Sequence, residues 1–239
     1  MSTLVVVVMP TYNEIENLED VVSEVLKQDR RIQILVVDDN SPDGTGKLAD
    51  KLSRDSERIH VLHRSNKGGL GSAYREGLKW ALELGADYVI QMDADFSHPP
   101  TKLNEMLDQI ESHDLVVASR YLQGVTVVNW PIQRLLLSWL GNHYARLITG
   151  VPLTDLTGGF RCIRRTLLEK SRFERTKSNG YAFQIELNCR LNKHRPRIKE
   201  LTFLFFDRTR GDSKLSFATV IEAIWIVWWL RILDITNRL

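Results

Sequence analysis

The sequence predicts an α/β protein in which helices flank a mostly parallel β-sheet, and two patterns carry this prediction. Short runs of β-branched apolar residues, each followed by turn residues, are typical of buried strands. Helical patterns lie between these runs, and strands that alternate with helices form right-handed βαβ units. The apolar runs of the first half span residues 4–9, 32–37, 59–62, 88–92 and 115–118.

The helices of the first half are predicted from the 3.6-residue repeat of their apolar positions. A helix over residues 14–28 gathers isoleucine, leucine and valine on one side, and a helix over residues 71–84 gathers alanine and leucine. Pro10 is expected to end the first strand, and Asn13 is expected to cap the helix that follows.

The second half of the chain is less regular. Proline is favoured in the first turn of a helix, so Pro131 predicts a helix over residues 131–148. Weaker patterns predict a strand over 158–163, a helix over 180–191 and a strand over 198–206, and a long amphipathic helix from residue 213 closes the chain. No repeat or linker interrupts the pattern, which favours a single domain over residues 1–239 with two lobes that meet near Gly124.

Composition and charge exclude several classes of protein. The chain has 239 residues, 43% hydrophobic and 26% charged, which is typical of a globular domain. Its net charge of +2 provides no basic field for nucleic acid. Cys162 and Cys189 lie far apart, which favours reduced thiols in a cytoplasmic protein. No apolar run reaches the roughly 20 residues of a spanning helix, and the first residues lack the basic start of a signal peptide.

The segment over residues 93–100 is the strongest chemical signal in the chain. Asp93 and Asp95 directly follow an apolar run, so both carboxylates are expected at the carboxyl edge of the sheet, where open α/β sheets bind ligands. Carboxylate oxygens suit Mg²⁺ or Mn²⁺, whose other ligands are often water and substrate phosphates. The segment therefore points to a metal-bridged nucleotide or nucleotide sugar, although Asp-x-Asp is also common in surface turns.

Polar residues also follow the first three strands. Tyr12 offers a flat face for a base and Glu14 an acceptor, although taken alone they fit a capped helix with a packed tyrosine better. Asp38 and Asp39 repel each other unless a base, a ribose or a nearby lysine lies beside them. The glycine-rich residues 66–71 lack the P-loop and Rossmann spacings, so they form a turn or a phosphate contact, and a hydride-transferring Rossmann enzyme is disfavoured.

Together these stretches resemble the catalytic domain of the dolichol-phosphate (polyprenol-phosphate) mannose synthases, in family 2 of the inverting GT-A glycosyltransferases. The resemblance rests on PTYNEIEN, VVDDNSPDGT, NKGGLGSAY, MDADFSHPP, ASRY, NWPIQR, TGGFRC, GYAFQIE and DRTRGDSK, which run in order from residue 10 to residue 214. The first two are shared by many family-2 enzymes. The DADxSHPP, NWP, GYxFQIE and DRxxGxSK patterns are narrower and indicate polyprenol-phosphate hexose synthases.

The resemblance implies a GT-A fold and a role for each matching residue. The nucleotide-binding half would span residues 1–123 and the acceptor-binding half residues 124–239. The donor nucleotide would be held by Pro10, Tyr12, Glu14, Val37 and Asp39. The metal and the diphosphate would be held by Asp93, Ala94 and Asp95, and Ser97 stands where relatives often carry a glutamine that assists the metal. The phosphates would be faced by Arg120, Arg134, Arg208 and Lys214.

The resemblance also implies the reaction. A hexose, with mannose from GDP-mannose as the first choice, would pass with inversion to a polyprenyl or dolichyl monophosphate. A phosphate monoester is largely ionised at neutral pH, so its attack needs no carboxylate base. Asp155 is the best carboxylate for sugar hydroxyls or acceptor orientation, ahead of Gln184 and Glu186, and His98 is expected to be structural.

Aromatic and apolar residues around Trp139 and Trp228 predict two helices that lie on a membrane surface, with ordinary core packing as the alternative. We therefore expect peripheral association with the cytoplasmic face of a membrane, and the resemblance allows for a membrane-anchoring partner subunit. Two alternatives stay open. One is a polyprenyl-phosphate glucose or other hexose synthase that uses a UDP-sugar, and the other is a non-catalytic subunit that binds a nucleotide sugar or lipid.

Overall fold

The computed structural model describes residues 3–206, 217–236 and 238–239. Its main sheet has seven strands in the order β3-β2-β1-β4-β7-β5-β8. β7 is antiparallel to both neighbours, whereas the other strand pairs of this sheet are parallel. The strands are β1 (Val5–Thr11), β2 (Ile32–Asp38), β3 (Ile59–His63), β4 (Tyr88–Gln91), β5 (Leu115–Ser119), β7 (Arg161–Arg164) and β8 (Ile198–Thr202). The predicted fold class is therefore confirmed.

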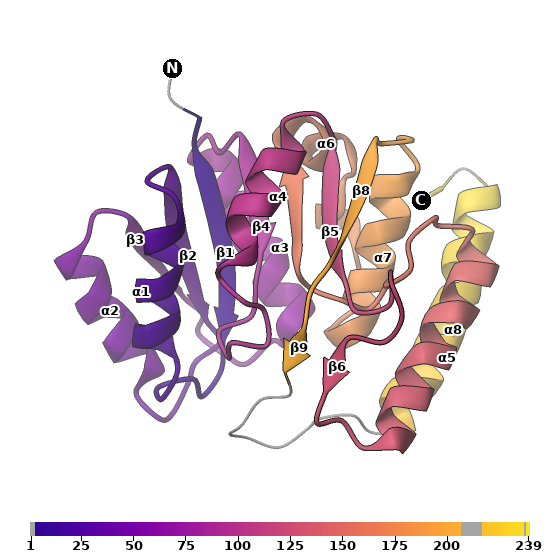
Figure 1. Cartoon of the computed structure of the whole chain (residues 1–239), viewed down its shortest axis with the longest axis horizontal. Helices are drawn as coiled ribbons and strands as arrows, with labels where there is room; N and C mark the ends of the chain where they lie inside the picture. Colours follow the sequence, from indigo (N-terminus) through magenta and orange to yellow (C-terminus); the bar gives the residue numbers. More distant parts are fainter. Residues whose placement is uncertain (1–2, 207–216, 237) are drawn as a thin grey trace.

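Helices cover both faces of the sheet (Figure 1). One face carries α1 (Leu18–Gln28), α2 (Thr45–Asp55) and α4 (Lys102–Ile110), and the other carries α3 (Leu70–Glu83), α6 (Arg165–Lys170), the short η1 (Phe173–Arg175) and α7 (Gly180–Asn192). Successive strand residues alternate between these faces, so Val6 and Val8 pack in one core layer and Val5 and Val7 in the other. This two-sided burial explains why the strands read as continuous apolar runs.

The last two long helices lie side by side at the β8 end of the molecule (Figure 1). They are α5 (Ile132–Thr149) and α8 (Phe217–Ile235), and α8 also packs on α7. A small second sheet pairs β6 (Val127–Val128) with β9 (Phe205–Phe206). Among the described residues, no helix combines the length and hydropathy needed to span a bilayer.

Several predicted boundaries move. β1 does not end at Pro10, because its register with β2 continues to Thr11, which lies opposite Asp38. The first helix begins at Leu18 rather than at residue 14. Asn13 does not cap that helix: its φ is 61°, and its N–H donates to Ser41 Oγ at 3.1 Å. The loop after β1 is thus bound to the loop after β2.

Two boundaries of the second half move as well. The strand predicted over 158–163 begins only at Arg161, which leaves residues 158–159 in a loop. The strand predicted over 198–206 is divided into β8, in the main sheet, and β9, in the small sheet. The loop at residues 158–159 lies beside Asp93.

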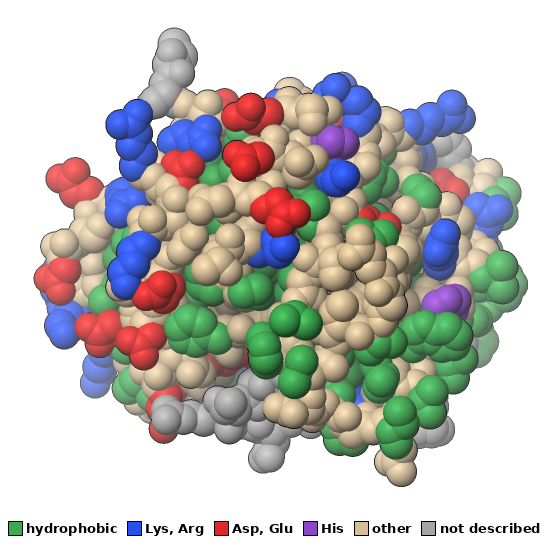
Figure 2. All heavy atoms as spheres, in the orientation of Figure 1, with side chains coloured by type: hydrophobic (Ala, Val, Ile, Leu, Met, Phe, Trp, Pro, Cys, Tyr) green, Lys and Arg blue, Asp and Glu red, His purple; other side chains and the backbone are tan. Residues whose placement is uncertain are grey.

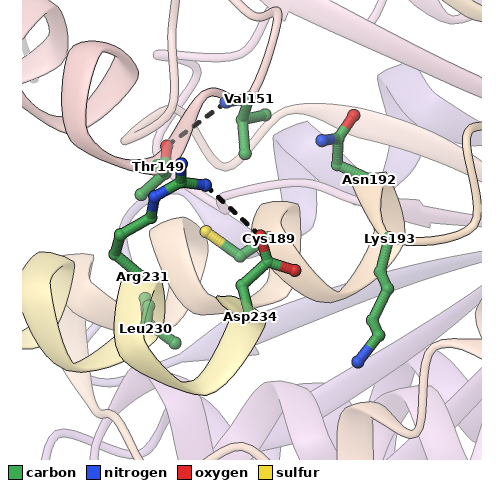
Figure 3. Close-up of a pocket in the computed structure, with 8 residues that line it drawn as sticks. All are labelled: Thr149, Val151, Cys189, Asn192, Lys193, Leu230, Arg231 and Asp234. Carbon is green, nitrogen blue, oxygen red and sulfur yellow. Dashed lines mark hydrogen bonds and ion pairs between the residues drawn. The ribbon is translucent and has the colours of Figure 1, made fainter. Parts of the chain in front are cut away.

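A pocket lies near the C-terminal ends of α5, α7 and α8 (Figure 3). Cys189 lines it, together with Lys193 and the ion-paired Arg231 and Asp234. Burial raises the pKa of the Cys189 thiol to about 12 and also raises that of Cys162. Both cysteines are free, as predicted. None of the residues that line this pocket is among the functional residues predicted from the sequence.

Candidate active site

The parallel sheet brings the predicted polar segments to one edge. β1, β2 and β4 are neighbours, so the segments that follow them emerge side by side. The Asp39 N–H donates to Thr11 O at 3.0 Å, and Thr11 Oγ1 donates to Asp38 Oδ1 at 3.3 Å. Because β7 is antiparallel, its first residues reach the same edge beside β4. This edge is the candidate active site.

Asp38 and Asp39 are both buried and are stabilised by protein donors. Asp38 Oδ1 accepts from Ser41 Oγ at 2.6 Å. The two oxygens of Asp39 accept from the N–H groups of Gly68 and Gly69, each at 2.9 Å, and the same carboxylate forms an ion pair with Arg64. The expected cation is thus an arginine rather than a lysine. Asp39 fixes the glycine-rich loop after β3 beside the loop after β2.

The other residues expected to hold a nucleotide differ in exposure. Tyr12 is half-buried, and Lys67 Nζ lies 3.6 Å from the centre of its ring. Glu14 is half-buried, and its N–H donates to Thr45 Oγ1 at 2.9 Å. Val37 is completely buried in the core, so only its backbone could reach a ligand, and Pro10 lies opposite it in the sheet.

The Asp-x-Asp segment follows β4. Ala94 is buried between the two carboxylates, whereas the Asp93 side chain is 36% exposed. Ser97 donates to Asp95 Oδ1 through its hydroxyl at 2.5 Å and through its N–H at 3.1 Å. Ser97 is itself buried, so this contact orients the Asp95 carboxylate.

Two buried rings support Asp93. Its N–H donates to His98 Nδ1 at 2.9 Å, and its Oδ1 accepts from the Tyr74 hydroxyl at 3.3 Å. Burial lowers the pKa of His98, and its ring stacks on Phe160 with 4.8 Å between ring centres. His98 therefore has the supporting role that we expected. Tyr74 was missed in the sequence because its place on α3 fits an ordinary core tyrosine.

Asp93 and Asp95 fit a hard divalent cation by the chemistry of their oxygen ligands. Within the described residues, no group of three or more His, Cys, Asp or Glu side chains is placed to hold a metal. Two carboxylates are enough for the mode in which one or two carboxylates hold Mg²⁺ and substrate phosphates supply further ligands.

The structure changes the role expected for Asp155. It is completely buried, and its oxygens accept from Arg120 Nε at 2.6 Å and Arg120 Nη2 at 2.7 Å. Burial acts to raise the pKa of Asp155, but the charge and hydrogen bonds of Arg120 hold it below its usual value. A carboxylate bound in this way is not presented to sugar hydroxyls. Asp155 instead holds Arg120 and accepts the Gly158 N–H at 2.9 Å.

Glu186 is also unavailable to a hexose. It is completely buried, forms an ion pair with Arg190 at 3.1 Å, and accepts the N–H groups of Lys177 and Ser178. Gln184 is also buried, but it lies close to the loop after Asp155 at the carboxyl edge of the sheet. A Cβ added to Gly159 would be 3.2 Å from Gln184 Nε2. Of the two candidates on α7, only Gln184 therefore lies beside the candidate active site.

The basic residues share an aromatic neighbour. Arg134 Cζ lies 4.1 Å from the centre of the Trp130 ring, and Arg120 Cζ lies 5.5 Å from it. Trp130 thus brings the start of α5 close to the end of β5. Arg208 and Lys214 lie outside the described residues.

This α/β fold is that of a glycosyltransferase, and the chain belongs to glycosyl transferase family 2, whose model matches residues 6–172. It is 44% identical to the polyprenol monophosphomannose synthase of Mycolicibacterium smegmatis over 229 residues, which cover 94% of this chain and 86% of that protein. It is 41% identical to the undecaprenyl-phosphate mannosyltransferase of Micrococcus luteus over 220 residues, which cover 92% and 90%.

Solved structures confirm the GT-A type of fold. Glucosyl-3-phosphoglycerate synthase from Mycobacterium tuberculosis, in complex with phosphoglyceric acid, aligns with a TM-score of 0.65 and 19% identity over 96% of this chain and 80% of that chain. S. aureus TarS 1–349, in complex with UDP-GlcNAc, aligns with a TM-score of 0.62 and 18% identity over 97% and 67%. At such identities the likeness concerns the fold alone.

The buried Arg120–Asp155 pair yields a stability prediction. Replacing Arg120 with Met leaves a buried carboxylate without its cation, so the free energy of unfolding at neutral pH should fall by about 3–5 kcal/mol. Because the folded pKa of Asp155 is below its unfolded value of 3.8, the pair stabilises fully above that value and loses its effect as the pH falls through the folded pKa. Urea unfolding over a pH series measures both effects.

Arg197→Met is the matched control for this prediction. Arg197 forms a similar pair with Asp114 at 3.0 Å, but its side chain is 64% exposed, so the loss should be far smaller than for Arg120→Met. Equal losses for the two variants would contradict the role given to the buried pair.

Proposed function

We propose that this chain transfers mannose from GDP-mannose to a polyprenyl monophosphate, giving a β-linked polyprenyl-phosphate mannose. The observation that carries the proposal is the match, over 94% and 92% of the chain, to relatives named as polyprenol monophosphomannose synthase and undecaprenyl-phosphate mannosyltransferase. The arrangement of Asp93 and Asp95 at the carboxyl edge supports it, because a nucleotide sugar carries a diphosphate that a carboxylate-held cation would bind.

The proposed donor site lies along β1, β2 and β4. Tyr12, Glu14 and the backbone of Pro10 and Val37 would hold the nucleotide, and Asp39 would act mainly by fixing the glycine-rich loop. Asp93 and Asp95 would hold Mg²⁺ or Mn²⁺, with Ser97 acting on the metal through the Asp95 carboxylate that it orients. When bound, such a cation neutralises charge on the departing diphosphate.

The proposed acceptor site lies toward Trp130. Arg134 would face the acceptor phosphate, since guanidinium groups bind phosphate oxygens in a bidentate manner. Arg120, fixed by Asp155, would add positive charge, and Arg208 and Lys214 keep the phosphate-binding role that the resemblance implies. The acceptor is already ionised, so its oxygen would attack the anomeric carbon from the face opposite the diphosphate, with inversion and without a protein base.

Asp95→Ala tests this proposal. Removing a group that organises the charge on a leaving diphosphate should lower turnover by about 10²–10³-fold. The measurement is the transfer of labelled mannose from GDP-mannose to undecaprenyl phosphate in the presence of Mn²⁺, with UDP-glucose as a parallel donor. Asp108→Ala is the control, because Asp108 is exposed on α4. Undiminished turnover by Asp95→Ala would refute the metal assignment, and transfer from UDP-glucose alone would refute the donor.

We further propose that the surface of α5 and α8 lies on a membrane, where the lipid acceptor resides. Figure 2 shows hydrophobic side chains gathered at the lower right of the molecule, on the side where Figure 1 shows α5 and α8. The most exposed are Leu147 at 82%, Trp225 at 74% and Ile235 at 69%, and the exposed set also includes Ile132, Leu136, Leu137, Trp139, Leu140, Trp228 and Ile232. An aromatic and apolar surface of this kind suits the membrane interface. The surface offers a contact for a membrane-anchoring partner as well.

Flotation with liposomes of phosphatidylglycerol and phosphatidylethanolamine measures this association. Wild type should float, and the Trp139→Ala/Trp228→Ala double variant should float less, because two interfacial aromatic side chains are lost. Leu84→Ala is the control, since Leu84 is exposed at the end of α3, on another part of the molecule. The proposal fails if wild type stays wholly in the soluble fraction, or if the control loses as much binding as the double variant.

A further inference from the structure

Arg161 is a buried arginine directly beneath the candidate active site. It begins β7 and is completely buried, and its Cα lies opposite Gln91 on β4 and Val117 on β5. Since β7 is antiparallel to β4, the first residue of β7 lies near the point where β4 ends and Asp93 follows. The sequence pattern does not predict a role for Arg161.

The guanidinium of Arg161 binds neutral groups. Nη1 donates to Asn188 Oδ1 at 2.7 Å, and Nη2 donates to the carbonyl oxygen of Gly158. Across the described ranges, no Asp or Glu forms an ion pair with it, and Nε is buried without a partner. Burial lowers the pKa of Arg161 to about 10. The charge of Asp155 acts in the opposite direction, but Asp155 is bound directly to Arg120. A buried arginine without a direct ion pair is costly, so stability alone does not account for an arginine at this position.

The loop that Arg161 holds is a ledge of bare backbone, residues 158–159. A Cβ added to Gly159 would lie 3.2 Å from Gln184 Nε2, 3.7 Å from His98 Cε1 and 3.9 Å from Asp93 Oδ1. A Cβ on Gly158 would lie 3.1 Å from an oxygen of Asp155. Neither glycine has a positive φ, so glycine is favoured here by the tight contacts that a Cβ would make and not by backbone conformation. The backbone of the ledge therefore lies close to Asp93, and Gly159 contributes no side chain of its own there.

Other buried polar groups fix the same loop. Asn188 Nδ2 donates to Leu156 O at 3.0 Å, so Asn188 connects the loop with Arg161. Asn142 Oδ1 accepts the Leu156 N–H at 2.7 Å. Gln184 Oε1, beside the ledge, is buried with no partner among the described residues, as expected of a polar atom in a site that a ligand completes.

We propose that Arg161 is a positioning residue, whose guanidinium holds the ledge of Gly158 and Gly159 against Asp93 so that the hexose diphosphate of the donor meets bare backbone beside that carboxylate. The inference rests on the proposed function and deepens it. Because Arg161 acts through the ledge, its loss should affect the alignment of the sugar more than the binding of the nucleotide. Lysine provides charge but not the two-pronged geometry, so it should not replace arginine here.

The test uses Arg161→Lys and Arg161→Gln in the full chain. Both variants should lower kcat for mannose transfer by about 10²-fold, the scale of a misplacement of about 1 Å. Their affinity for GDP with Mn²⁺, measured by calorimetry, should equal that of wild type. Amide hydrogen exchange should become faster in residues 155–159. Asn188→Ala removes one acceptor of the guanidinium and should change kcat and amide hydrogen exchange in the same direction. This variant replaces the Arg161 variants in the test if those do not fold.

Arg190→Gln is the matched control. Arg190 is also a buried arginine, but it forms an ion pair with Glu186. The Arg190→Gln variant should therefore be less stable than wild type, while its kcat and its amide hydrogen exchange at the ledge should not change. If wild type transfers mannose and the Arg161 variants behave like Arg190→Gln, or if Arg161→Lys keeps full kcat, the inference is overturned alone. If wild type transfers no mannose, the proposed function fails, and the exchange data still decide whether Arg161 holds the ledge.

Discussion

The carboxylates at the carboxyl edge of this sheet are stabilised by hydrogen-bond donors from other loops, and the arrangement of the site depends on this constraint. Asp38 accepts from Thr11 at the end of β1, Asp39 accepts from the glycine-rich loop after β3, and Asp155 accepts from Arg120 after β5. Buried carboxylates that lacked such donors would repel one another and would lose their hydration without compensation. The hydrogen bonds to these carboxylates join the loops after β1, β2 and β3 into one surface.

The same constraint separates two kinds of carboxylate. Asp39 and Asp155 are buried and use both oxygens within the protein, so they shape the edge. Asp93 and Asp95 each receive a protein donor but keep part of their surface toward solvent. A cation and a diphosphate would therefore meet an edge that is already rigid, and a preorganised site avoids reorganisation during the reaction.

The sequence predicts the sheet and the place of Asp93 and Asp95 because both follow from local pattern: apolar runs form strands, and the next residues lie at the edge. The sequence does not predict which aspartates are bound by protein donors and so have a structural role. Asp155 and Arg120 are 35 positions apart, and Asp39 and Arg64 are 25 apart. The burial of Arg161 depends on β7 inserting antiparallel between β4 and β5, a topology that alternating strands and helices do not reveal.

Arg120 and Arg161 illustrate what burial alone means for an arginine. Arg120 has a buried counter-charge in Asp155, and such pairs are often replaceable by apolar residues with little loss of stability. Arg161 donates only to neutral acceptors among the described residues, and the charge of Asp155 acts on it without a direct ion pair. Charges interact more strongly in a medium of low permittivity. A cation without a direct ion pair under this edge favours anions above it, which supports the proposed binding of a diphosphate there.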